Sequence, residues 1–83
     1  MSYALTLDEL KERGAGRPAP DDVRRLYHEA FAKYGPAYLW SRRELVSPTI
    51  AQAISIAETL RVEGDLAARA LAVRIERACR ASL

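Results

Sequence analysis

Residues 47–81 read SPTIAQAISIAETLRVEGDLAARALAVRIERACRA, and this stretch decides the fold class. Apolar side chains recur in it at spacings of three and four, which is the period of an amphipathic helix. The pattern breaks once, at Gly64-Asp65, where glycine can turn the chain and aspartate can cap a new helix. We therefore expect two long helices, over residues 48–63 and 65–81, which form an antiparallel hairpin because their connection is short.

Both helices of this hairpin have a start signal and a core face. Ser47 before Pro48 is typical of an N-cap followed by the first helical residue, so the first helix should begin at Pro48. Its expected core residues are Ile50, Ala53, Ile54, Ala57 and Leu60, with Ile56 on the flank, and those of the second helix are Ala68, Leu71, Ala72, Ile75 and Cys79.

The N-terminal part of the chain carries the signals of a short helix, a linker and a longer helix. Thr6 and Glu9 have the spacing of a capping box, which predicts a short helix within residues 1–13. Glycine and proline dominate residues 14–20, a composition typical of a linker. Apolar side chains recur again at helical spacing over residues 21–34, which predicts a helix there.

Residues 35–46 are expected to end that helix and to form a second short one. Gly35-Pro36 predicts a stop, since glycine commonly ends helices and proline cannot continue them. We expect residues 37–46 to make one or two helical turns rather than a strand. Trp40 is the largest side chain of this segment, and in so short a chain we expect it to be in the core.

Size and composition agree with a small all-α fold. The 83 residues predict a single domain, a bundle of about four to five helices of which two are short. Hydrophobic residues make up 49% and charged residues 29%, which indicates a globular rather than a disordered chain. No segment approaches 18 consecutive apolar residues, and the N-terminus lacks the features of a signal peptide. We therefore expect a cytoplasmic protein without membrane contact.

The sequence contains no recognisable set of catalytic or metal-binding residues. His28-Glu29 matches the start of a zinc-protease motif, but Ala32 stands where the second histidine is required. Cys79 is the only cysteine, and it lies on an expected core face with no base beside it. We therefore expect no enzymatic activity, no cofactor and no bound metal.

The charge balance limits the classes of partner. Thirteen Lys and Arg against eleven Asp and Glu leave a net charge of +2, which is small for a general nucleic-acid binder. Most of the cations are arginines, which bind carboxylates and phosphates in a bidentate way. High-GC coding bias would produce the same preference for arginine.

The last helix carries the first candidate partner-binding set, which consists of Arg69, Val73, Arg74, Arg77 and Arg80. On a helical wheel Arg69, Arg77 and Arg80 fall within roughly 80° of one another, with Arg74 just outside. Glu76 is the only acid between residues 66 and 83. This arrangement indicates a docking ridge for an acidic protein surface or for phosphates, or else a solvated outer face whose arginine stems cover apolar neighbours.

A second candidate set, in the segment of residues 37–46, interleaves aromatic and cationic side chains. Trp40, Arg42 and Arg43, with Tyr38 beside them, have a composition that suits stacking on single-stranded bases. The same aromatic residues would serve equally well to close the core. If Trp40 is exposed, it becomes the first candidate for a protein-binding hot spot.

Residues 50–79 resemble a single tetratricopeptide-type hairpin. The resemblance rests on small and apolar positions at helical spacing, the bend at Gly64-Asp65 and an alanine-rich second helix. It implies a contribution to a peptide-binding groove. Arg69 departs from the pattern, which prefers a small residue there, and ordinary packing of two helices explains the same spacing.

These observations favour a small non-enzymatic module for protein–protein interaction, an adaptor, regulator or inhibitor that binds an acidic partner through helix surfaces. The first alternative is a nucleic-acid-binding protein that uses the arginines of the last helix. The second alternative is a homo-oligomeric helical bundle, because short amphipathic chains often complete their core by pairing.

Overall fold

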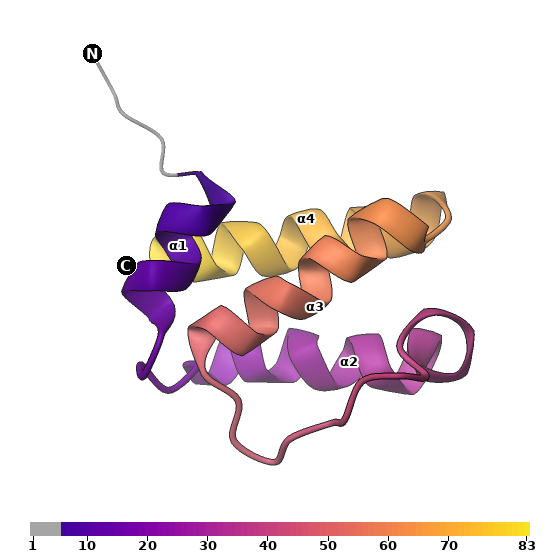
Figure 1. Ribbon diagram of the computed structural model, residues 1–83, viewed down its shortest axis with the longest axis horizontal. Coiled ribbons are helices and arrows are strands. Elements are labelled where there is room, and N and C mark those ends of the chain that lie inside the picture. The colour runs from indigo at the N-terminus through magenta and orange to yellow at the C-terminus, as the bar shows by residue number, and fades with distance from the viewer. Residues whose placement is uncertain (1–5) are drawn as a thin grey trace.

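The computed structural model describes residues 6–83, which form four helices and no strand (Figure 1). The helices are α1 (Leu7–Gly14), α2 (Asp21–Tyr38), α3 (Ile50–Glu63) and α4 (Leu66–Ala81). The expected all-α fold, a small helical bundle, is therefore confirmed. Residues 1–5 of the predicted segment 1–13 lie outside the described part of the chain.

Helices α3 and α4 form the expected antiparallel hairpin (Figure 1). The Asp65 carboxylate caps α4 by accepting a hydrogen bond of 2.9 Å from the Ala68 N–H. A side chain at Gly64 would collide with the Leu60 carbonyl oxygen and would place its Cβ 2.5 Å from the Cβ of Ala68. The tight turn therefore requires glycine at this position.

The expected core faces of both helices are confirmed. Every predicted core residue is buried, from Ile50, Ala53, Ile54, Ala57 and Leu60 on α3 to Ala68, Leu71, Ala72, Ile75 and Cys79 on α4. Ile56, expected on the flank, is buried as well. The segment that follows α2 crosses this side of α3, which the helical period alone does not reveal.

Helix α3 begins later than the Ser47-Pro48 pattern predicts, because Thr49 is the N-cap. The Thr49 Oγ1 accepts a hydrogen bond of 3.1 Å from the Gln52 N–H, and the Gln52 Oε1 accepts one of 2.7 Å from the Thr49 N–H. Pro48 is buried, and its carbonyl accepts a hydrogen bond of 3.0 Å from the Ala19 N–H. This tertiary pairing outweighs the local start signal of Ser47 and Pro48.

The linker of residues 14–20 is packed against the start of α3. Pro18 and Thr49 form an isolated antiparallel bridge. Beside it, the Arg17 carbonyl accepts a hydrogen bond of 2.9 Å from the Ile50 N–H. The two stretches that precede α2 and α3 thus hold each other in extended conformations.

Helix α2 continues through Gly35 and Pro36, so the predicted stop at these residues is wrong. Pro36 lies in the last turns of the helix, where its missing N–H removes one hydrogen bond. The Leu39 N–H contacts the carbonyl oxygens of Gly35 and Tyr34 at 3.1 and 3.3 Å, and the Leu39 side chain is buried. Burial of Leu39 against the bundle explains why the helix tolerates this proline.

The segment between α2 and α3 contains no helix, so the short helix expected at residues 37–46 is wrong. Side chains hold this segment instead. Arg42 donates hydrogen bonds of 2.8 and 2.9 Å to the hydroxyl oxygens of Ser55 and Thr59 on α3. The Leu45 N–H donates one of 2.9 Å to the Tyr27 hydroxyl oxygen on α2. These long-range hydrogen bonds hold the segment in place without the local backbone hydrogen bonds of a helix.

Trp40 is also not where we expected it. Its side chain is 78% exposed, whereas Leu39 beside it is buried. Leu39 fills the core at this end of α2. The expectation that Trp40 would be in the core is therefore wrong.

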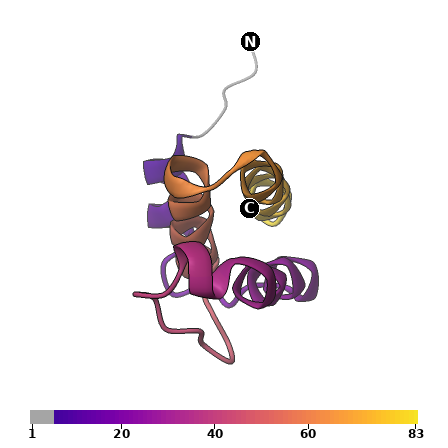
Figure 2. The same ribbon diagram turned by 90° about the vertical axis from the view of Figure 1, so that its right-hand side faces the viewer.

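The N-terminal helix is part of the bundle. Figure 2 shows α1 against α3, with α4 on the other side of α3, and α2 contacts both α3 and α4. Leu10 of α1 is fully buried, and the Lys11 Nζ lies 2.8 Å from the Glu58 Oε1 of α3. All four helices contribute to one hydrophobic core.

Candidate functional site

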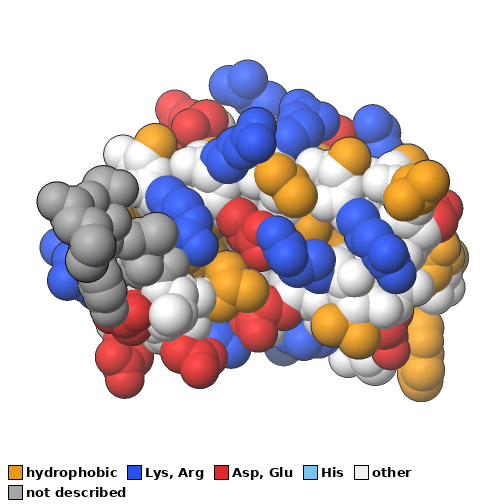
Figure 3. All heavy atoms as spheres, turned by 90° about the horizontal axis from the view of Figure 1, so that it is seen from above, with side chains coloured by type: hydrophobic (Ala, Val, Ile, Leu, Met, Phe, Trp, Pro, Cys, Tyr) orange, Lys and Arg blue, Asp and Glu red, His pale blue; other side chains and the backbone are white. Residues whose placement is uncertain are grey.

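The outward side of α4 carries a band of arginines. We call the residues Leu66, Arg69, Val73, Arg77 and Arg80 the α4 outer face; it lies opposite the core residues of this helix. Arg69 and Arg77 are exposed, and within residues 6–83 neither has an ion-pair partner. Lysine and arginine side chains gather along this side of the molecule in Figure 3.

The only acid of α4 does not oppose these charges at the surface. Glu76 is buried, and its Oε2 accepts a hydrogen bond of 2.9 Å from the Arg61 Nη2 of α3. Its Oε1 is buried and has no hydrogen-bond partner in the described part of the chain. The single negative charge of α4 is thus turned inward and paired, which leaves the α4 outer face cationic.

Arg74, the fourth predicted arginine, belongs to a different contact. Its Nη1 lies 3.4 Å from the Glu29 Oε2 of α2, which the Lys33 Nζ also approaches at 3.1 Å. The Lys33 hydrogen bond, together with the charges of Lys33 and Arg74, holds the pKa of Glu29 below its usual value. Arg74 therefore helps to join α4 to α2 and lies beside the α4 outer face rather than on it.

Apolar side chains lie among the arginines. Leu66 is 83% exposed, and Val73 is half-buried. Residues seven apart lie nearly in line on a helix, so Leu66 and Val73 form the middle of the α4 outer face, with Arg69 and Arg77 at its two edges. Val62, just before the turn of the hairpin, is exposed as well. Sequence reasoning missed Leu66, although its seven-residue spacing to Val73 was a usable signal.

The second predicted set, Trp40, Arg42 and Arg43, lies on another surface. Figure 2 shows the segment that carries these residues and α4 toward different sides of the bundle. All three side chains are exposed. The structure therefore does not combine the two predicted sets into one site.

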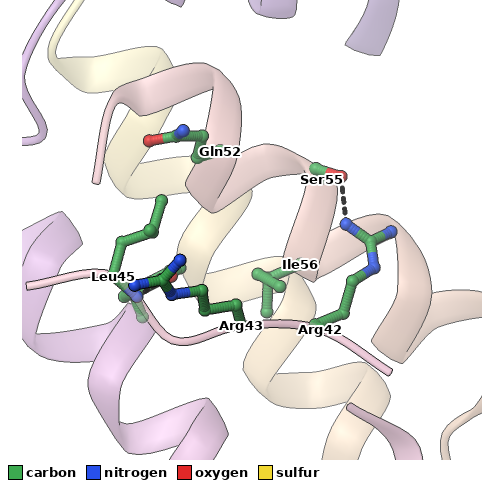
Figure 4. Close-up of a pocket in the computed structure, with 7 residues that line it drawn as sticks. Arg42, Arg43, Leu45, Gln52, Ser55 and Ile56 are labelled. Carbon is green, nitrogen blue, oxygen red and sulfur yellow. Dashed lines mark hydrogen bonds between the residues drawn. The ribbon is translucent and has the colours of Figure 1, made fainter. Parts of the chain in front are cut away.

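Arg42 and Arg43 line a pocket of about 200 Å³ between α2, the connecting segment and α3 (Figure 4). The other residues that line it are Tyr27, Leu45, Gln52, Ser55 and Ile56. Figure 4 shows the two arginines on either side of Ile56, with Gln52 and Ser55 on α3 across from them. We call this the Arg42–Arg43 pocket. Sequence reasoning missed Tyr27, Gln52 and Ser55, because only the path of the connecting segment brings these residues together.

The only histidine and the only cysteine of the chain offer no free reactive group: His28 contacts Glu44, and Cys79 is buried. The Nδ1 of His28 lies 2.6 Å from the Glu44 Oε2, and the His28 side chain is only partly exposed. Burial raises the pKa of the Cys79 thiol to about 12, and the charges of Asp22 and Glu76 add to this effect. Within residues 6–83 no group of three or more His, Cys, Asp or Glu side chains is placed to hold a metal ion.

None of the helices in the described part of the chain combines the length and the apolar character needed to cross a membrane. Helix α1 packs on α3, and α2 packs on both helices of the tetratricopeptide-like hairpin, so its packing partners come from the same chain. Comparison with protein families, curated proteins and solved structures gave no match.

Proposed function

We propose that this protein is a small non-enzymatic interaction module that binds a partner protein with an acidic surface through the α4 outer face. The observation that carries the proposal is the composition of this face: exposed Leu66 and half-buried Val73 lie in the middle of an arc of arginines. Protein interfaces commonly have an apolar centre, a polar rim and an enrichment in arginine.

The charge distribution supports an acidic partner. With Glu76 buried against Arg61, no carboxylate of α4 opposes Arg69 and Arg77 at the surface. Arginines without an intramolecular partner can form bidentate hydrogen bonds to carboxylates of another protein. A positive surface also speeds encounter with a negative one and disfavours partners of the same sign.

The apolar centre favours a protein over a nucleic acid as the partner. Phosphate contacts need cations and polar groups, and they gain little from an exposed leucine such as Leu66. The net charge of +2 is also small for a chain that would depend on phosphate contacts. Self-association through the same face would place Arg69 and Arg77 of one molecule against the same arginines of a second molecule. Repulsion between these like charges disfavours such a dimer.

Affinity capture from a lysate of the native host tests this proposal. Wild type is compared with R69E/R77E and with a charge-matched control, R17E/R25E, which changes two exposed arginines elsewhere and lowers the net charge equally. A third variant, L66Q, removes the apolar centre without a change in charge. We expect wild type and R17E/R25E to capture the same protein, and this capture should persist after nuclease treatment. The purified partner should bind R69E/R77E and L66Q at least about tenfold more weakly.

Three results would contradict the proposal. Equal loss of capture by R69E/R77E and R17E/R25E would mean that general charge, not the α4 outer face, attracts the partner. Loss of all capture after nuclease, with a steep dependence on salt, would favour nucleic-acid binding. A melting temperature that rises with protein concentration, in the absence of any captured partner, would favour the homo-oligomeric bundle.

A further inference from the structure

The Arg42–Arg43 pocket contains more hydrogen-bond donors than the protein itself uses. Arg42 is held in place by the hydroxyl oxygens of Ser55 and Thr59, both of which are neutral. Arg43 has no hydrogen-bond or ion-pair partner in residues 6–83. The positive charges of both arginines are therefore not matched by a carboxylate at this site.

The neutral polar groups that line the pocket also have donors to offer. The Gln52 Oε1 already accepts a hydrogen bond from the Thr49 N–H, which leaves the Gln52 amide hydrogens without an acceptor in the described residues. The Ser55 Oγ accepts from Arg42, so the hydrogen of its own hydroxyl is also available. Each of these groups uses its acceptor oxygen within the protein and keeps hydrogens available in the lining of the pocket.

Tyr27 gives the most specific signal, because its side chain is almost fully buried. The Tyr27 hydroxyl oxygen accepts a hydrogen bond of 2.9 Å from the Leu45 N–H, but its hydrogen has no acceptor within residues 6–83. A buried donor without an acceptor is costly, so its presence at the wall of a pocket indicates a ligand that accepts hydrogen bonds. Burial also raises the pKa of Tyr27, which keeps this hydroxyl protonated at neutral pH.

No carboxylate lines the pocket. The nearest acid in the chain, Glu44, lies between Arg43 and Leu45 in the sequence, but its Oε2 is 2.6 Å from the His28 Nδ1. It contributes to a different hollow, with His28, Leu45 and Val46. The negative charge closest in sequence to the two arginines is thus held outside their pocket.

We propose that the Arg42–Arg43 pocket binds a small phosphate-bearing ligand. The phosphate oxygens accept hydrogen bonds from Arg43, Tyr27 and Gln52, while the fixed charge of Arg42 attracts the anion from the opposite side of Ile56. No carboxylate lines the pocket to accept hydrogen bonds from a cationic ligand, whereas an oxyanion satisfies several of its donors at once. Phosphate is favoured over a single carboxylate because it offers more acceptor oxygens, arranged in three dimensions, to donors that come from three parts of the chain.

This binding site is independent of the α4 outer face, since the two lie toward different sides of the bundle. A failure of the partner experiment therefore leaves this proposal intact, and the reverse also holds.

Titration of ¹⁵N-labelled protein with inorganic phosphate, followed by NMR at constant ionic strength, tests the proposal. The variant is R43Q, because the Arg43 side chain has no hydrogen-bond or ion-pair partner within residues 6–83 and its replacement should not disturb the fold. The matched control is R25Q, which removes an exposed arginine of α2 that belongs to neither proposed site. Acetate serves as the carboxylate ligand. We expect saturable shifts of the Leu45, Gln52 and Ser55 amides with phosphate, and weaker binding of acetate. R43Q should weaken phosphate binding at least about tenfold, and R25Q should leave it unchanged.

The outcomes separate this site from general charge attraction. Equal weakening by R43Q and R25Q, or the absence of saturation, would overturn the proposal. Acetate binding as tight as that of phosphate would overturn the choice of ligand. A single-stranded oligonucleotide that binds far more tightly than phosphate, and loses this advantage in R43Q, would replace the small ligand by a nucleic-acid backbone.

Discussion

Cys79 is the residue whose chemistry the fold changes most. It is fully buried on the inner side of α4, and burial, followed by the charges of Asp22 and Glu76, raises its thiol pKa to about 12. At neutral pH the thiol is protonated and behaves as a small apolar side chain. The core position that helical spacing predicts for Cys79 thus also explains why it is a poor nucleophile.

This raised pKa predicts a loss of stability in alkaline solution. In the unfolded chain the thiol ionises at about pH 8.5, whereas in the folded protein it keeps its proton up to about pH 12. Below about pH 8.5 the thiol is protonated in both states, and its burial contributes fully to stability. As the pH rises from there toward 12, only the unfolded state loses the proton, so the free energy of unfolding falls. Urea denaturation of wild type should therefore show a larger loss between pH 7 and pH 10 than that of C79A, although C79A is less stable at pH 7. Equal losses would contradict this assignment.

At the scale of elements, the helices were predictable where local signals and tertiary contacts agree. The hairpin of α3 and α4 follows from its apolar period, the turn at Gly64 and the cap at Asp65, all of which act within a few residues. The segment between α2 and α3 was not predictable, since its conformation depends on hydrogen bonds from Arg42 to α3 and from Leu45 to α2. The Arg42–Arg43 pocket depends on the same contacts, so the sequence identified its arginines but not the side chains that face them.

Two glycines predict different effects of the same substitution. At Gly35, inside α2, a Cβ would meet no atom within 4 Å beyond its chain neighbours and the backbone of its own helix, whereas at Gly64 a Cβ meets the Leu60 carbonyl oxygen and the Ala68 Cβ. We expect G35A to change the free energy of unfolding by less than about 1 kcal/mol, because the higher helix propensity of alanine is opposed by the clash of its Cβ with the Cδ of Pro36. G64A should destabilise it by about 1–3 kcal/mol through overpacking. Thermal melts of both variants check this, and a stabilising G64A would show that the turn adapts.

At the scale of the whole molecule, the N-terminal helix and the linker belong to the same packed unit as the hairpin. Leu10 of α1 is fully buried, and the bridge between Pro18 and Thr49 joins the linker to the start of α3. Sequence reasoning left open whether α1 packs on the bundle, because an eight-residue helix has few apolar residues with which to signal its partner. The contact of Lys11 with Glu58 adds an ion pair to this packing.

The docking of α1 predicts cooperative unfolding. We expect L10A to cost about 2–4 kcal/mol, the range for a buried leucine reduced to alanine. Unfolding followed by circular dichroism and by amide NMR signals of α1 and α4 should still give one coincident transition. If α1 unfolds in an earlier transition, or if L10A lowers the free energy of unfolding by less than about 1 kcal/mol, α1 is held by surface contacts rather than by burial of Leu10.

The exposure of Trp40 has a consequence for how the molecule can be studied. It is the only tryptophan of the chain, and its ring is 78% exposed in the folded state, so its fluorescence emission should change little when the protein unfolds. A macromolecule that covers the ring would shift that emission toward shorter wavelengths, because the indole would leave water. Trp40 therefore makes a poor reporter of folding but an intrinsic optical reporter of occupancy on its side of the bundle, two residues from Arg42, and it needs no label.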